Sequence, residues 1–248
     1  MLATVSGVND PSGPPPPIPP WGPPQPWTPP SPADRLRVAW QRRHESDYIF
    51  DFVTALGWIL LTCGVYGYYV LYQLVRRSRD HNQRRWELLD AATNLAWEQA
   101  QAQGVSEELR PHFQQISERS RAFSEIAAEF RDPVLWAVLS AVSGNIAQFV
   151  AWALLDGDLV KHEAAERAIE EELETIYARL GHPLAIPIAP AVKGRHNVAG
   201  RVVATIASCG IYSWWWMHDL MVEGNAHFER NWRFEDELAR ASQSFLAA

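Results

Sequence analysis

Three histidines, each followed nine positions later by an acidic residue, are the side chains of this sequence best suited to chemistry. The pairs are His81 with Asp90, His162 with Glu171, and His227 with Asp236. An imidazole with a carboxylate suits a divalent metal ion or a proton relay. Nine positions are about two and a half helical turns, so a histidine and its acid point to different faces of one helix. Pairing therefore has to occur between segments, and the alternative is three polar residues at a water interface.

An internal repeat places these histidines equivalently. A shift of 146 positions aligns the first copy with the last, matching Cys63 with Cys209, Gly64 with Gly210, Tyr66 with Tyr212, His81 with His227 and Trp86 with Trp232. A shift of 81 positions brings a fainter middle copy into register, with His162 under His81. In each copy an uncharged apolar stretch leads into a charged, helix-forming segment. Such a repeat indicates duplicated architecture.

The apolar stretches predict membrane spans. Residues 52–75 and 133–155 carry no charge, and each run is longer than the roughly 20 residues that cross a hydrocarbon core of about 30 Å. The third span is predicted over 202–222, of which 202–218 are uncharged. A buried core helix is the alternative for each. The resulting prediction is an all-α integral membrane protein with three spans, located as a multi-pass protein in a prokaryotic cell membrane.

Composition and periodicity divide the chain into seven segments. They are a disordered proline-rich tail (1–33), a juxtamembrane helix (34–50), repeat copy 1 (52–103), a returning helix (106–132), repeat copy 2 (133–180), an extended loop (181–200) and repeat copy 3 (201–248). The returning helix and the charged part of copy 1 form the predicted extramembrane helical hairpin. In the tail, Trp21 and Trp27 are candidate anchors for a partner with an aromatic-lined groove.

The predicted topology argues against a site built from all three histidines. If each copy crosses the membrane once, His162 lies on the opposite side from His81 and His227. We therefore predict no metal site and no cofactor, and His81 with His227 remain as the candidates for a metal pair. The alternative is that Gly64, Gly144-Asn145 and Gly210 break the apolar stretches into re-entrant loops, which would bring the histidines to one face. Irregular backbone exposed to lipid is unfavourable, which weighs against this alternative.

Composition narrows the function classes. The net charge is −7 and the basic residues are dispersed, so nucleic-acid binding is not expected. Cys63 and Cys209 are too few for a disulfide framework and are expected to be small buried packing residues. Phosphate-loop, nucleophile-elbow, paired-cysteine and His-Glu-x-x-His motifs do not occur, so an enzyme is not expected.

The leading prediction is a structural or interaction role at the membrane. Its expected partners are the lipid bilayer, further copies of the chain and a binder of the proline-rich tail. The alternatives are a small oligomeric transporter or channel, whose polar span residues face one another, and a metal-dependent membrane enzyme that uses His81 and His227.

The first and last copies share a pattern of Gly-(Val/Ile)-Tyr, aromatic residues, Leu and a His-bearing charged helix. This pattern resembles an uncharacterised family of prokaryotic membrane proteins that is described only as a domain of unknown function. The resemblance covers residues 61–90 and 208–238, whereas the middle copy has Asn145-Ile-Ala instead. It implies a multi-span membrane protein and carries no activity or catalytic residue with it.

Overall fold

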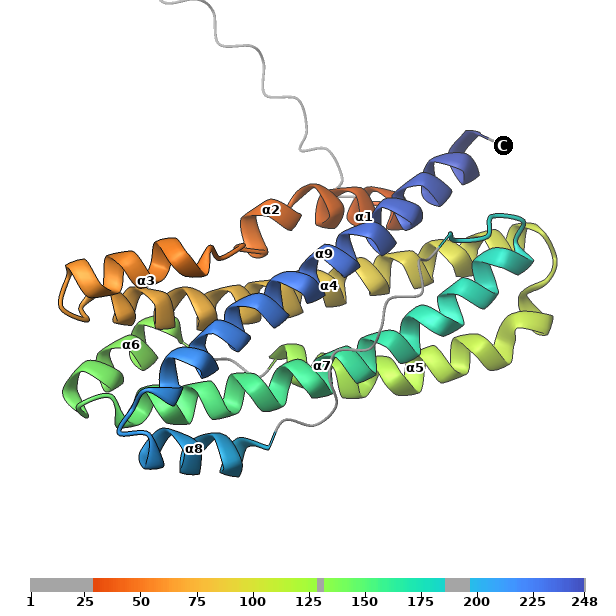
Figure 1. Ribbon diagram of the computed structural model, residues 1–248. Helices are drawn as coiled ribbons and strands as arrows, with labels where there is room; N and C mark the ends of the chain where they lie inside the picture. Colours follow the sequence, from red (N-terminus) through yellow and green to blue (C-terminus); the bar gives the residue numbers. More distant parts are fainter. Residues whose placement is uncertain (1–28, 129–131, 186–196, 248) are drawn as a thin grey trace, which may run out of the picture. The chain divides into compact units, whose positions relative to one another are not determined.

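The computed structural model of the chain describes residues 29–128, 132–185 and 197–247, and every regular element within these ranges is a helix. The helices are α1 (Pro32–Gln41), α2 (Arg43–Ser46), α3 (Phe52–Leu61), α4 (Tyr66–Ala102), α5 (Ser106–Ala128), α6 (Pro133–Val142), α7 (Ile146–Arg179), α8 (Val198–Ala207) and α9 (Tyr212–Ala247) (Figure 1). The predicted tail anchors Trp21 and Trp27, and most of the loop predicted over 181–200, lie outside the described residues.

Each repeat copy folds as a short helix, a tight turn and a long helix. The pairs are α3 with α4, α6 with α7, and α8 with α9. Each short helix has ten residues, and its first turn donates hydrogen bonds to the side chain just before it, which is Asp51, Asp132 or Asn197. Asp and Asn are favoured there because their oxygen accepts from backbone N–H groups that lack a partner within the helix. These three caps obey the repeat shifts of 81 and 146.

The turn of each copy contains two successive residues in the left-handed region. The φ angles of these pairs are 49° and 94° at Cys63-Gly64, 60° and 72° at Gly144-Asn145, and 50° and 91° at Cys209-Gly210. Glycine and asparagine adopt this conformation at lower cost than other residues, which explains the second position of each pair. The amide of Gly64 also donates to the carbonyl of Ile59 at 2.8 Å, a bond that closes the end of the short helix.

The prediction of an integral membrane protein with three spans is wrong. Among the described residues, none of the helices combines the length and the apolar run that a membrane span requires. The runs predicted as spans, 52–75, 133–155 and 202–222, are each divided by a turn into a short helix and the first part of a long one. A ten-residue helix is about 15 Å long, half of a hydrocarbon core of about 30 Å. The predicted location as a multi-pass protein of a cell membrane depended on these spans and is therefore wrong as well.

The long helices α4, α7 and α9 start at the same end of a bundle and run in the same direction, with α5 beside α4 and α7 (Figure 1). The short helices lie together at that end, which we call the hairpin end. Each short helix packs on the long helix that follows it and on one other: α3 on α9, α6 on α4, and α8 on α7. The three copies therefore close on one another in a cycle, and the hairpin formed by α4 and α5 packs into the bundle instead of standing alone.

The buried apolar side chains form two clusters along the bundle. The cluster near the hairpin end includes Leu74 and Trp216, and the second cluster includes Leu95 and Leu173. The stretches of α4, α7 and α9 between these clusters carry the repeated histidines and a set of buried charges. Polar groups at this depth need partners that replace the hydrogen bonds they would make in bulk water.

The expectation that Cys63 and Cys209 are buried packing residues is wrong, because both are exposed. They occupy the first left-handed position of their turns, at the hairpin end, where the chain reverses. This placement follows from the backbone of the turn, which puts the first left-handed residue at the tip of the hairpin.

Candidate metal centre

The three repeat-equivalent histidines meet inside the bundle. The ring centroids of His81 and His162 are 5.4 Å apart, those of His81 and His227 are 5.2 Å apart, and those of His162 and His227 are 5.4 Å apart. Each side chain comes from a different long helix, and none of the three residues is more than 2% exposed. The expectation that His162 lies on the opposite side from His81 and His227 is therefore wrong. The turns at the hairpin end make the long helices parallel, so equivalent positions reach the same level.

Glu166 joins the histidines from α7, one turn after His162. Its Oε2 atom lies 3.5 Å from Nε2 of His227 and 3.7 Å from Nε2 of His162. One ligand atom from each of these four residues lies within 4.8 Å of all the others. Ligand atoms bound to a tetrahedral zinc ion at about 2.0–2.1 Å are about 3.3 Å apart, so small side-chain movements bring the four onto one ion. We call His81, His162, Glu166 and His227 the His3Glu cluster.

The hydrogen bonds of the rings leave nitrogen atoms available to an ion. Nδ1 of His81 lies 2.9 Å from Oδ1 of Asp47. Because a carboxylate only accepts, Nδ1 carries a proton. Nδ2 of Asn231 lies 3.4 Å from Nε2 of His81 and 3.2 Å from Nε2 of His227, so an ion bound by these two nitrogens would displace that amide. Neither ring nitrogen of His162 has a hydrogen-bond partner within the described residues, nor does Nδ1 of His227. Buried polar atoms without partners are rare in folded proteins. An ion bound by Nε2 of His162 would give that atom a partner.

The environment sets the protonation states that a metal ion requires. Burial lowers the pKa of His162 to about 3 and holds the pKa of His227 well below its ordinary value, so both rings are neutral at pH 7. Burial by itself raises the pKa of Glu166, but the attractions of Arg85 and of the three histidines together outweigh it and leave that pKa well below its ordinary value. Neutral imidazoles and an ionised carboxylate are the ligand forms that bind transition metals.

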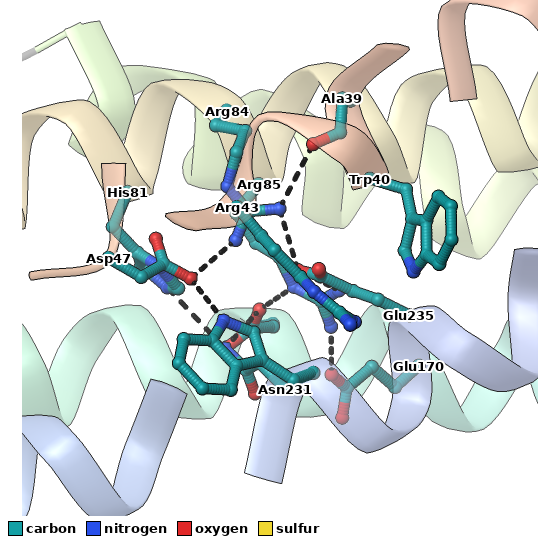
Figure 2. A network of polar contacts seen from close by, with 12 residues as sticks. Ala39, Trp40, Arg43, Asp47, His81, Arg84, Arg85, Glu170, Asn231 and Glu235 are labelled. Carbon is teal, nitrogen blue, oxygen red and sulfur yellow. Dashed lines mark hydrogen bonds and ion pairs between the residues drawn. The ribbon is translucent and has the colours of Figure 1, made fainter. Parts of the chain in front are cut away.

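A network of buried charges lies beside His81 (Figure 2). Arg84 and Arg85 follow His81 along α4, so the network adjoins the cluster on the side away from the hairpin end. Arg85 bonds to Glu166, Glu170 and Glu235, and Arg84 bonds to Glu235 and Asp47. The network holds four carboxyl groups against two guanidinium groups, and burial raises the pKa of Glu170 and of Glu235. The neighbouring Arg230 is bonded to Glu163 at 2.9 Å and also lies 3.5 Å from Oε2 of Glu166, so it offsets part of the negative charge. A divalent cation at the His3Glu cluster would offset the excess of negative charge in this network.

One repeat position supplies three complementary parts of this site. Arg85, Glu166 and Asn231 each lie four residues after a repeated histidine, so they share one helix face with it. Nδ2 of Asn231 donates to both carboxylate oxygens of Glu166 at 3.0 Å. At the same level of the bundle, the three copies therefore supply different groups. Glu166 is the carboxylate, Arg85 is its counter-charge and Asn231 is a neutral hydrogen-bond donor.

A cavity of about 40 Å³ borders all three histidines on the side of the hairpin end. Leu74, Leu155 and Leu220, each two helical turns before its histidine, form the apolar part of its wall. Arg77 and Asp158 also line it, and burial lowers the pKa of Arg77 to about 9. A space of this size holds water or a small ligand next to the cluster.

The acids predicted to pair with the histidines lie elsewhere. Asp90 binds Arg35 at 2.8 Å, and Asp236 accepts from the indole of Trp40 at 2.8 Å and pairs with Arg43. These arginines of the segment predicted as a juxtamembrane helix are therefore bonded within the fold. The position nine residues after each histidine faces outward because two and a half turns rotate it to the opposite face.

Sequence reasoning missed the two carboxylates that matter most for this site. Glu166 had a readable signal, since it follows His162 by four positions and so shares its helix face. Asp47 had none, because it reaches His81 only after the segment that follows α2 packs against α4.

The other repeat-equivalent residues serve the fold. Gly64 and Gly210 form the turns, and Tyr66 and Tyr212 begin α4 and α9. Trp86 and Trp232 differ although the repeat aligns them. The indole of Trp232 donates to Asp47 at 2.7 Å, whereas Trp86 is 37% exposed.

Replacing Asp47 with Asn is expected to weaken zinc binding by about 10–100-fold, because Nδ1–H of His81 loses its charged acceptor and the ring loses its fixed orientation. A competition titration against a chromophoric chelator, made on protein whose helix content is unchanged, measures the effect. Asp90→Asn is the matched control, because Asp90 is the acid that spacing alone assigns to His81. Equal zinc affinities for the two variants would contradict the role given to Asp47.

Comparisons of the chain with protein-family models, with curated proteins and with solved structures found no match. The resemblance to a family of prokaryotic membrane proteins therefore stays a prediction.

Proposed function

We propose that this chain is a metal-binding protein that holds one divalent transition metal ion in the His3Glu cluster, with Zn²⁺ as the first candidate. The observation that carries the proposal is the convergence of four ligand atoms within 4.8 Å of one another in a buried layer. This extends the prediction that His81 and His227 could form a metal pair, because His162 and Glu166 complete the set.

The donor set favours particular ions. Three imidazoles and one carboxylate in a compact arrangement suit Zn²⁺, whereas Mg²⁺ and Ca²⁺ prefer six or more oxygen ligands. Fe²⁺, Co²⁺ and Cu²⁺ also accept imidazole ligands and are the competitors of Zn²⁺ at such a site.

The ion has a structural consequence in this proposal. His81, His162 and His227 each belong to a different repeat copy, so one ion crosslinks α4, α7 and α9. Four protein ligands fill a tetrahedral coordination sphere, as is usual for ions that stabilise a fold.

Metal analysis of the purified chain tests the proposal. After dialysis against zinc and removal of the excess, we expect one zinc ion per chain by elemental analysis. His162→Gln keeps a polar side chain of similar size but removes a ligand, so its zinc content should fall to background. In the cobalt-loaded protein, visible absorption bands of tetrahedral Co²⁺ should appear with the wild-type chain and disappear with this variant.

His112→Gln is the matched control. His112 is also paired with a carboxylate, with Nδ1 2.7 Å from Glu172, but it lies outside the cluster. We expect this variant to bind zinc as the wild-type chain does. Zinc bound by neither wild type nor control, or bound equally by His162→Gln, would refute the proposal.

A second candidate function is metal-dependent catalysis, and the cavity beside the histidines is the observation that favours it. Catalytic zinc sites keep one coordination position for water or substrate. If the carboxylate of Glu166 stays with Arg85 and leaves that position open, azide should bind the cobalt-loaded protein and shift its visible spectrum. A spectrum unchanged by azide supports the structural role instead.

The transporter or channel alternative requires spans that face one another. The absence of a spanning helix among the described residues removes the support that the predicted spans lent to it.

A further inference from the structure

The hairpin end presents an apolar surface that no described part of the chain covers. The residue after each turn is a β-branched aliphatic one in all three copies, and it is 66% exposed at Val65, 69% at Ile146 and 73% at Ile211. The short helices add further exposed apolar side chains, such as Leu61, Val142 and Ile206. Contiguous apolar surface of this kind on a folded protein marks a site of interaction.

Charge is excluded from the turns of the hairpin end and from the parts of the helices next to them. The first hairpin has no charged residue between Asp51 and Arg76, and the second has none between Asp132 and Asp156. In the third, residues 202–218 are uncharged. The charges that bound these runs lie at the open ends of the hairpins, so every charged group is about ten residues away from the turns. Ten helical residues span about 15 Å, which equals the depth of one leaflet of a hydrocarbon core of about 30 Å.

The backbone amides of the turns form hydrogen bonds within the protein, as a lipid environment requires. A hydroxyl at the same repeat position, Thr62, Ser143 or Ser208, accepts a hydrogen bond at 2.9–3.0 Å from the amide four residues later, at the start of the following long helix. The amides of five of the six left-handed turn residues donate to carbonyls of the preceding short helix; they belong to Cys63, Gly64, Asn145, Cys209 and Gly210. In water such groups can bond to solvent, but in hydrocarbon each unsatisfied group is costly. These internal hydrogen bonds reduce the cost that irregular backbone would otherwise carry in lipid.

The arrangement of the short helices favours lipid over a second copy of the chain. Each short helix packs on a different pair of long helices, so the outward faces of α3, α6 and α8 point to different sides of the bundle. One protein partner would cover one of these faces. Hydrocarbon surrounds all three at once.

We propose that the hairpin end inserts into one leaflet of a phospholipid bilayer and that no part of it crosses the membrane. The proposal goes beyond metal binding and does not depend on it. The chain carries a net charge of −7, so binding to neutral phosphatidylcholine would have to come from apolar insertion and not from attraction to anionic headgroups.

Flotation of the full chain with phosphatidylcholine vesicles tests this surface. We expect wild-type protein to float with the vesicles at low and at high salt. The triple variant Val65→Asp, Ile146→Asp and Ile211→Asp should lower the vesicle partition coefficient by at least about tenfold. Its folding should be preserved, because the three positions are exposed and lie at helix N-termini, where Asp is favourable.

The control variant adds the same charge at exposed positions away from the turns, with Val38→Asp, Gln101→Asp and Thr175→Asp. It should partition as the wild-type chain does. A second readout uses Cys63 and Cys209, the chain's two cysteines, which lie at two of the turns. A polarity-sensitive fluorophore on these thiols should shift to the blue when vesicles are added, and a quencher carried on lipid tails should quench it.

Three results would overturn the proposal. They are wild-type protein that does not float, a triple variant that floats as well as the control, and a fluorophore whose emission ignores vesicles. Sedimentation of the chain without lipid tests the competing possibility, which is that a second copy of the chain covers this surface. An oligomer that the triple variant dissociates, in a chain that does not float, would assign the surface to contact between copies. Zinc content is measured separately, so failure here leaves the metal proposal untouched.

Discussion

Removing zinc with a chelator is expected to lower the free energy of unfolding by about 4 kcal/mol when the ion was present at about a thousand times its dissociation constant. The ion binds the folded chain through ligands from α4, α7 and α9, which separate on unfolding, so its binding energy is added to the stability of the fold. For a chain of this length the loss corresponds to a decrease of roughly 8–16 °C in the unfolding midpoint. Calorimetry before and after chelation, followed by return of zinc, measures it.

The control for this result is His162→Gln, which removes a ligand from the cluster. Its unfolding midpoint should not respond to chelator or to zinc, although it can differ from that of the wild-type chain. A wild-type midpoint that zinc does not move, or an equal response of the variant, would show that the cluster does not hold the ion.

Replacing Arg85 with Met is expected to destabilise the metal-free protein by about 3–5 kcal/mol, the range for removing one partner of a buried ion pair. Arg85 is 0% exposed, and its guanidinium bonds to Glu166, Glu170 and Glu235. Met fills much of the same volume but leaves these carboxyl groups without their main counter-charge. Urea unfolding in the presence of chelator measures the loss without a contribution from zinc.

Arg37→Met is the matched control for Arg85→Met. Arg37 pairs with Asp34 three residues away, and the two side chains are 61% and 52% exposed. Exposed pairs of this kind contribute about 0–1 kcal/mol, so this substitution should change stability little. If Arg85→Met costs no more than Arg37→Met, the buried network is not the source of stability that its contacts indicate.

Several elements of the fold were readable from the chain. The turn residues Gly64, Asn145 and Gly210 stand at one repeat position, and the cap of α6 by Asp132 follows from its place before Pro133. An uncharged run ends at Val75, and Gly104 interrupts the helical pattern that follows it. These two positions likewise predicted a charged helix and its antiparallel partner. These features are local, since each depends on backbone preferences of a few neighbouring residues.

Hydropathy could not predict whether each apolar stretch forms one membrane span or a helical hairpin. A run of 24 uncharged residues is long enough for one span, and equally long enough for a ten-residue helix, a turn and the start of a second helix. The choice depends on left-handed backbone at Cys63, a residue type that seldom adopts it, and on packing of α3 against α9. Neither leaves a mark on a hydropathy profile.

The candidate site shows the same division. Spacing alone established that His81, His162 and His227 are equivalent and that each lies on the polar part of a helix. The direction of the helices decided whether equivalence meant proximity. Alternating spans would have separated His162 from the others, whereas hairpins that turn back at one end make α4, α7 and α9 parallel and bring equivalent residues to one level.

The sequence by itself determined the repeat, the helical character of its copies and the residues that occupy equivalent positions, because these follow from spacing and local backbone preference. Only the tertiary structure decided that Glu166 and Asp47 join the histidines while Asp90 and Asp236 do not. The physical reason is that side chains meet according to helix face and helix direction. Both are fixed by how the copies pack on one another, at distances along the chain that no local pattern records.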